Sequence, residues 1–321
     1  MAFRRDAWKV RPWKPPSGLV SSRVRRPEVF DWLLDPYSSG FMVRALGAAV
    51  IVGVFAPAVG VWIVLRRLSY LGDAMSHSAL GGVGIALLLG LGVTVGALAA
   101  GVVVALLIGA LSAHPRLRED SVIGVVETAL FGIGVLVISR NSSSLGVSLD
   151  SFLFGQILTV DETDIVGNLA LMIIGLTALG LLFSDLRAAT FDPVHAALVG
   201  VRVGPLRVAL LMLLAIAIVV SLQTVGRLMS IAMLVTPAAA ARLITDRLRT
   251  MTQAAVGIGV ACAFVGLTAS YHLSTPPGAT VALATVAALI LTFMATIPRR
   301  TRHRHAAPDP DGGFLGASAT A

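Results

Sequence analysis

Asp73 and His77 are the two residues whose types and spacing point most directly to chemistry. They lie four residues apart in an apolar run, and residues i and i+4 of a helix share one face. A carboxylate and an imidazole together suit Zn²⁺, Mn²⁺ or Fe²⁺. Ionisable groups at membrane depth are costly and usually serve a function. The pair therefore predicts an intramembrane metal site. The alternative is that Asp73 caps its helix and His77 bonds a neighbouring helix.

The depth of this pair follows from its spacing to Arg66 and Arg67, which mark the membrane edge. At ~1.5 Å per residue, Asp73 lies roughly 10 Å and His77 roughly 16 Å beyond Arg66. A hydrocarbon core of about 30 Å places His77 near the midplane, where a translocated ion needs a ligand.

Glu127 is a second ionisable residue in an apolar run, and no Lys or Arg occurs between Glu119 and Ser139. The same arithmetic places it roughly 10 Å deep, level with Asp73. It is a candidate third oxygen ligand or proton acceptor beside Asp73 and His77. A protonated glutamate that makes one interhelical hydrogen bond is an equal alternative.

The composition indicates a polytopic membrane protein and excludes several other classes. The 321 residues are 56% hydrophobic and 13% charged, with a mean hydropathy of +0.87. The net charge of +8 resides in loops and tails, which favours a membrane surface over nucleic acid. The single Cys262 excludes intrachain disulfides and multi-cysteine clusters. Lys9 and Lys14, the only lysines, follow no glycine-rich loop, so ATP hydrolysis would need another subunit.

Long apolar runs predict an all-α fold with about nine transmembrane helices, or eight if one is miscounted. Residues 1–33 are expected to form a basic flexible tail, residues 34–297 the transmembrane domain, and residues 298–321 a disordered, cytoplasmic C-terminal tail. A further short piece, Ser151 to Val160, is a candidate re-entrant or interfacial segment. The nine expected spans are 42–65, 73–91, 93–113, 121–139, 163–184, 206–225, 228–245, 251–271 and 278–297.

Arginines concentrate on alternate loops, which predicts the orientation. The richer set is expected in the cytoplasm together with the C-terminus. Its members are Arg66, Arg67, Arg116, Arg118, Arg187, Arg202, Arg207, Arg242, Arg247, Arg249, Arg299, Arg300, Arg302 and Arg304. The opposite side has only Arg44, Arg140 and Arg227. Nine spans would then place the basic N-terminal tail outside the cell. The arginines of the short loops and the basic residues of the tail therefore predict opposite sides of the membrane for the N-terminus.

The longest cytoplasmic connection contains a short capped helix. Asp192 before Pro193 is a good N-cap with proline in the first turn, and Gly200 is placed to end the helix after about two turns. The small residues Ala196 and Ala197 lie between them. Such a helix suits docking into a groove of a partner subunit, and an ordinary connecting helix is equally compatible.

Four motifs in this order resemble the zinc/manganese/iron ABC-transporter permease family, over about residues 34–297. The resemblance is strongest to the permease subunits of zinc importers. The motifs are Tyr70–His77 after Leu65–Arg67, Phe154–Leu158, Leu234–Arg242 and Thr275–Gly278.

The resemblance implies a homodimer with one pore in the plasma membrane, two cytoplasmic ATPase subunits and an extracytoplasmic metal-binding protein. It implies no resident cofactor and a divalent cargo, with Zn²⁺ first and Mn²⁺ or Fe²⁺ as alternatives. Asp73 and His77 match the family's metal path, and the segment from Ala196 to Gly200 matches the loop that contacts the ATPase. Where many zinc-importer relatives have a histidine, this chain has Thr128. The adjacent Glu127 is a harder ligand, which weakens the preference for zinc over manganese.

Three other functions are weighed against this one. A related ABC permease for iron chelates or a cobalamin-like ligand would not need a buried carboxylate–imidazole pair. A proton-coupled secondary metal carrier fits the composition, and neighbouring genes for an ATPase and a binding protein would exclude it. An intramembrane metalloenzyme is disfavoured because the sequence has no His-Glu-x-x-His helix.

Overall fold

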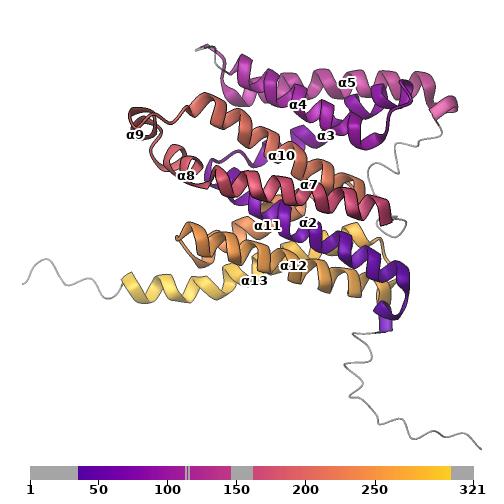
Figure 1. The fold of residues 1–321 in the computed structure, drawn as a ribbon. Coiled ribbons are helices and arrows are strands. Elements are labelled where there is room, and N and C mark those ends of the chain that lie inside the picture. Colours follow the sequence, from indigo (N-terminus) through magenta and orange to yellow (C-terminus); the bar gives the residue numbers. More distant parts are fainter. Residues whose placement is uncertain (1–34, 113, 115, 146–161, 305–321) are drawn as a thin grey trace, which may run out of the picture. The chain divides into compact units, whose positions relative to one another are not determined.

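The computed structural model describes residues 35–112, 114, 116–145 and 162–304, and these are helical outside short connections (Figure 1). This confirms the predicted all-α class. Ser151 to Val160, the candidate re-entrant segment, lies outside the described residues. The elements are η1 (Asp35–Ser38), α2 (Gly40–Leu65), α3 (Ser69–Leu88), α4 (Val93–Leu111), α5 (Glu119–Leu145), α7 (Glu162–Leu181), α8 (Phe183–Phe191), α9 (Pro193–Leu198), α10 (Val203–Val225), α11 (Arg227–Ile244), α12 (Leu248–Leu273) and α13 (Pro277–Arg304).

Each of the nine expected spans coincides with one long helix in the described part of the chain. Seven of these helices are long and apolar enough to cross a bilayer: α2, α4, α5, α7, α10, α12 and α13. The other two are α3, which contains Asp73 and His77, and α11, whose apolar part Met229–Ile244 is shorter. Helix α13 continues beyond Ile297 to Arg304, so the segment expected to be a tail begins as helix.

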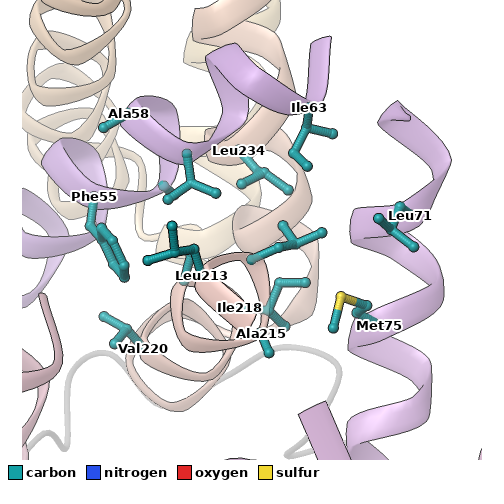
Figure 2. Close-up of a cluster of buried hydrophobic side chains, with 14 of the residues drawn as sticks. Phe55, Ala58, Ile63, Leu71, Met75, Leu213, Ala215, Ile218, Val220 and Leu234 are labelled. Carbon is teal, nitrogen blue, oxygen red and sulfur yellow. The ribbon is translucent and has the colours of Figure 1, made fainter. Parts of the chain in front are cut away.

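Helix α2 lies at the centre of the bundle, because 78% of its most apolar window is buried inside the chain. It packs against α10, α11, α12 and α7. The outermost of the seven is α13, with 11% of the corresponding window buried. Figure 2 shows side chains of α2, α3, α10 and α11 pointing toward one another in one apolar cluster, among them Phe55, Leu71, Leu213 and Leu234. Helix α2 also continues through Pro57.

Helix α3 packs mainly against α4 and α5, and glycines permit close contact with both. A Cβ at Gly82 would lie 2.2 Å from the Gly96 carbonyl oxygen of α4. A Cβ at Gly81 would lie 2.4 Å from the Leu130 carbonyl oxygen of α5. Gly134 of α5 faces α3 in turn, because its Cβ would meet the backbone nitrogen of Gly81 at 2.7 Å. The backbones of α3, α4 and α5 therefore touch with no side chain between them at these points.

Helices α2 and α3 are joined by only three residues, Arg66 to Leu68. Arg67 adopts a left-handed conformation with φ 59°, and the Leu68 amide donates to the Ile63 carbonyl oxygen at 3.0 Å. A left-handed residue followed by this backward hydrogen bond is a common way for a helix to end. Helix α2 is thereby closed directly before α3 begins.

Candidate metal site

The side chains of Asp73, His77 and Glu127 converge, although Glu127 comes from a different helix. His77 Nε2 lies 3.6 Å from Asp73 Oδ1 and 3.9 Å from Glu127 Oε1. One ligand atom from each residue lies within 4.8 Å of the other two. Ligands of a single cation at about 2.1 Å are separated by about 3.0–4.2 Å. A small inward movement of these side chains would therefore allow all three to bind one divalent cation.

The local sequence explains why α3 presents this face. Tyr70, Asp73 and His77 follow the i, i+3, i+7 spacing of one helix face. Leu71 and Met75 lie on the opposite side and are buried in the apolar cluster (Figure 2). Burial of one face thus directs the ionisable face away from the core.

Helix α5 supplies two groups to His77. Glu127 brings the second carboxylate, and Phe131, one turn further, makes an edge-on ring contact with His77 at 5.1 Å between centroids. The glycine contacts at Gly81 and Gly134 hold α3 and α5 close enough for these side chains to meet. The sequence predicted Glu127 to lie level with Asp73 but could not assign α5 as the neighbour of α3.

Tyr70 is a neighbour of the site for which the sequence alone predicted no role. Its hydroxyl donates a hydrogen bond to Glu127 Oε2 at 2.9 Å. The i, i+3, i+7 spacing to Asp73 and His77 was the signal that could have found it. Phe131 could have been found in the same way, since it lies four residues after Glu127.

The site opens to one side of the chain. The side chains of Asp73, His77 and Glu127 are 33%, 20% and 14% exposed in the single chain. Glu127 lies on the candidate span α5, with Asp73 beside it on α3, and a carboxylate partly exposed to lipid is unfavourable. This face must therefore adjoin water or protein.

The expected short helix is present as α9. The Asp192 carboxylate accepts a hydrogen bond from the His195 amide at 2.8 Å, as an N-cap does. Gly200 has φ +88°, the left-handed region, and follows the end of the helix. Ala196 is fully buried against the rest of the chain, whereas Ala197 is exposed. The large exposed side chains in this region are Phe191, Val194, Leu198 and Val199.

A partly buried cluster of charged groups joins α8 to the helices of the site. Arg66, at the end of α2, donates from Nε to the Thr190 hydroxyl of α8 at 3.0 Å. Arg207 of α10 forms an ion pair with Glu119 in the first turn of α5. Burial lowers the pKa of the Arg66 guanidinium, the nearby Arg207 lowers it further, and Glu119 raises it. One carboxylate thus lies close to two guanidinium groups.

Replacing Glu119 with glutamine should destabilise the protein, because Arg66 and Arg207 would then face each other without a carboxylate. We expect a loss of about 1–3 kcal/mol, measurable as a lower thermal midpoint of the detergent-purified protein. Asp246→Asn is the matched control. Its ion pair with Arg242 lies on the surface, with Asp246 92% exposed, and should contribute about 0.3–0.5 kcal/mol. Equal midpoints for the two variants would contradict this view of the cluster.

Comparison with known proteins identifies the family. The model of the ABC 3 transport family matches residues 38–296, which is most of the chain. The chain belongs to this family. The resemblance found in the sequence is therefore confirmed, and the protein is an ABC-transporter permease with several membrane spans in the plasma membrane.

Two relatives of this ABC 3 permease are named for manganese and for chelated iron. It is 38% identical over 264 residues to the manganese transport system membrane protein MntC of Halalkalibacterium halodurans, covering 82% of this chain and 89% of that one. It is 34% identical over 250 residues to the chelated iron transport system membrane protein YfeC of Yersinia pestis, covering 78% and 84%. The solved structure of PsaBC from Streptococcus pneumoniae in complex with Fab matches with a TM-score of 0.76 and 29% identity, covering 86% and 99%.

Proposed function

We propose that this ABC 3 permease imports Mn²⁺ or Fe²⁺, which pass Asp73, His77 and Glu127 during alternating access. The observation that carries the proposal is the convergence of three ligand atoms from α3 and α5 within 4.8 Å. The names of the manganese and iron relatives support it. The cation is the cargo of this site, so its ligation must be weak enough for release.

The donor set favours Mn²⁺ or Fe²⁺ over the zinc first expected from the sequence. Two carboxylates and one imidazole form a harder ligand set than the His- and Cys-rich sites typical of zinc. The relatives reported above also give zinc no support. The sequence-based preference for zinc is therefore replaced here by manganese or iron.

The open side of the site supports a homodimer. A second copy presenting the same face would remove both carboxylates from lipid and enclose a polar path between two α3 helices. Each protomer would then contribute three ligands, and the cation would pass from one set to the other. An extracytoplasmic metal-binding protein would deliver the cation, and two cytoplasmic ATPase subunits would drive the movement.

The α8–α9 region is the proposed contact with the ATPase. Phe191, Val194 and Leu198 offer an exposed apolar surface at a capped helix, which suits a groove in a partner. Ala196 would support this helix from inside and would not touch the partner, since it is fully buried. Asp192 and Gly200 would fix its two ends, and Ala197 remains available to the partner.

Gly200→Val should uncouple transport from ATP hydrolysis without preventing membrane insertion. A β-branched residue at φ +88° is strained by about 1–3 kcal/mol, which would displace the end of α9. We expect metal-stimulated ATP hydrolysis by the assembled complex to fall several-fold. Gly257→Val is the matched control, since Gly257 lies inside α12 with open space around its added Cβ and no positive φ. Normal coupling in the Gly200 variant would remove α9 from the ATPase contact.

Uptake of radioactive manganese tests which cation the permease transports. Cells that lack other manganese importers would express this permease with its ATPase and binding protein, and unlabelled Mn²⁺, Fe²⁺ or Zn²⁺ would compete. We expect Mn²⁺ and Fe²⁺ to inhibit at lower concentrations than Zn²⁺. Stronger competition by Zn²⁺ than by Mn²⁺ would restore the zinc assignment, and no uptake above vector-only cells would refute manganese import.

A further inference from the structure

Tyr70 and His77 contact different oxygens of the same carboxylate. The Tyr70 hydroxyl donates to Glu127 Oε2 at 2.9 Å, whereas Glu127 Oε1 lies 3.9 Å from His77 Nε2. Tyr70 stands two residues into α3, on the helix face that carries Asp73 and His77. The carboxylate is thus held with one oxygen toward the other two ligands and one toward the phenol.

The different contacts of the two Glu127 oxygens matter because a carboxylate can bind a divalent cation through one oxygen or through both. A phenol is a neutral hydrogen-bond donor at neutral pH, so it can occupy one carboxylate oxygen without adding a charge to the site. Bidentate binding would require Glu127 Oε2 to turn from Tyr70 toward the cation. While the hydrogen bond holds, binding through Oε1 alone is favoured.

Within its own chain Tyr70 is not held by packing, since the residue is 58% exposed there. Its hold on Glu127 therefore comes mainly from the hydrogen bond, and removing the hydroxyl should release Oε2 without opening a cavity. Loss of one such bond corresponds to a change of about three- to tenfold in an equilibrium constant.

We infer that Tyr70 is a positioning residue that keeps Glu127 monodentate toward the transported cation and so speeds its release. This inference rests on the proposed function of the Asp73–His77–Glu127 site. Without the phenol, Glu127 would bind the cation through both oxygens, and the cation would be held more tightly and released more slowly.

The test compares wild type, Tyr70→Phe and the control Tyr271→Phe in cells that carry the complete transporter. Manganese uptake is measured over a range of concentrations and normalised to the amount of permease in the membrane. We expect Tyr70→Phe to lower the half-saturating concentration and the maximal rate, each by about three- to tenfold. Tyr271 lies in α12 and contacts the ring of His272, so its variant should match wild type.

Direct binding provides a second readout. The free Mn²⁺ signal in electron paramagnetic resonance, titrated with the purified complex, should give a dissociation constant about three- to tenfold lower for Tyr70→Phe. A half-saturating concentration and a dissociation constant that stay unchanged or rise would overturn the inference. Asp73→Asn distinguishes failure of the proposed site from failure of the role of Tyr70 alone. If it transports normally, the proposed site itself fails; if it is inactive while Tyr70→Phe matches wild type, only the role of Tyr70 fails.

Discussion

Asp73→Asn and His77→Ala should each abolish manganese uptake at limiting metal concentrations while the permease still assembles in the membrane. Both residues are partly exposed, so neither substitution removes much packed volume. Each removes one of three ligand atoms that lie within 4.8 Å of one another. Mutation of even the outer-shell partners of metal ligands lowers metal affinity or activity about 10–100-fold. Removal of a ligand itself should therefore lower the uptake rate by more than about a hundredfold. The measurement is the initial uptake rate per amount of permease in the membrane.

The double mutant should be little worse than either single mutant, because the two residues act as one site. His272→Ala and Asp246→Asn are the controls, since they remove the same side-chain types outside the candidate site. Wild-type uptake by either Asp73→Asn or His77→Ala would show that the pair is structural and that the cation takes another path.

Gly60→Ala should strongly destabilise the folded permease. A Cβ at Gly60 in α2 would lie 1.7 Å from the backbone carbonyl oxygen of Leu234 in α11, and 2.8 Å from its carbonyl carbon. No change of rotamer can relieve a clash with backbone, so the two helices must separate and the surrounding apolar cluster must open. We expect a loss of at least about 1–3 kcal/mol, seen as a lower thermal midpoint and less permease in the membrane.

Gly47→Ala is a control in the same helix, because nothing lies within 4 Å of its added Cβ. Alanine is favoured over glycine in a helix by about 1 kcal/mol, so this variant should match or exceed wild type in stability. If Gly60→Ala were as stable as Gly47→Ala, the close contact between α2 and α11 would be incorrect.

Features set by short-range sequence were predicted well. The nine apolar runs coincide with nine long helices, because a spanning helix needs a continuous apolar length that is visible in the sequence. The limits of α9 follow from Asp192 and Gly200, whose capping roles are local. The common face of Asp73 and His77 follows from helical periodicity alone.

Features that depend on which helices are neighbours could not be predicted in the same way. Glu127 joins Asp73 and His77 because α5 lies against α3, and that contact depends on Gly81 and Gly134. Glycines occur throughout the spans, and nothing in their spacing names the partner helix. The direction of the Tyr70 hydroxyl toward Glu127 depends on the same contact and was missed for that reason.

The direct backbone contacts of α3 with α4 and α5 also have a mechanical consequence. Helices α3, α4 and α5 touch through their backbones at Gly81, Gly82 and Gly96, where no flexible side chain can absorb a displacement. The three helices therefore form one rigid unit. Asp73, His77 and Glu127 all belong to this rigid unit. The three residues around Arg67 connect the unit to α2. A tilt of the rigid unit would move the three ligands together and preserve their mutual distances. In the proposed homodimer, the cation would then be released when the rigid units of the two protomers separate, while the ligand positions within each protomer stay unchanged.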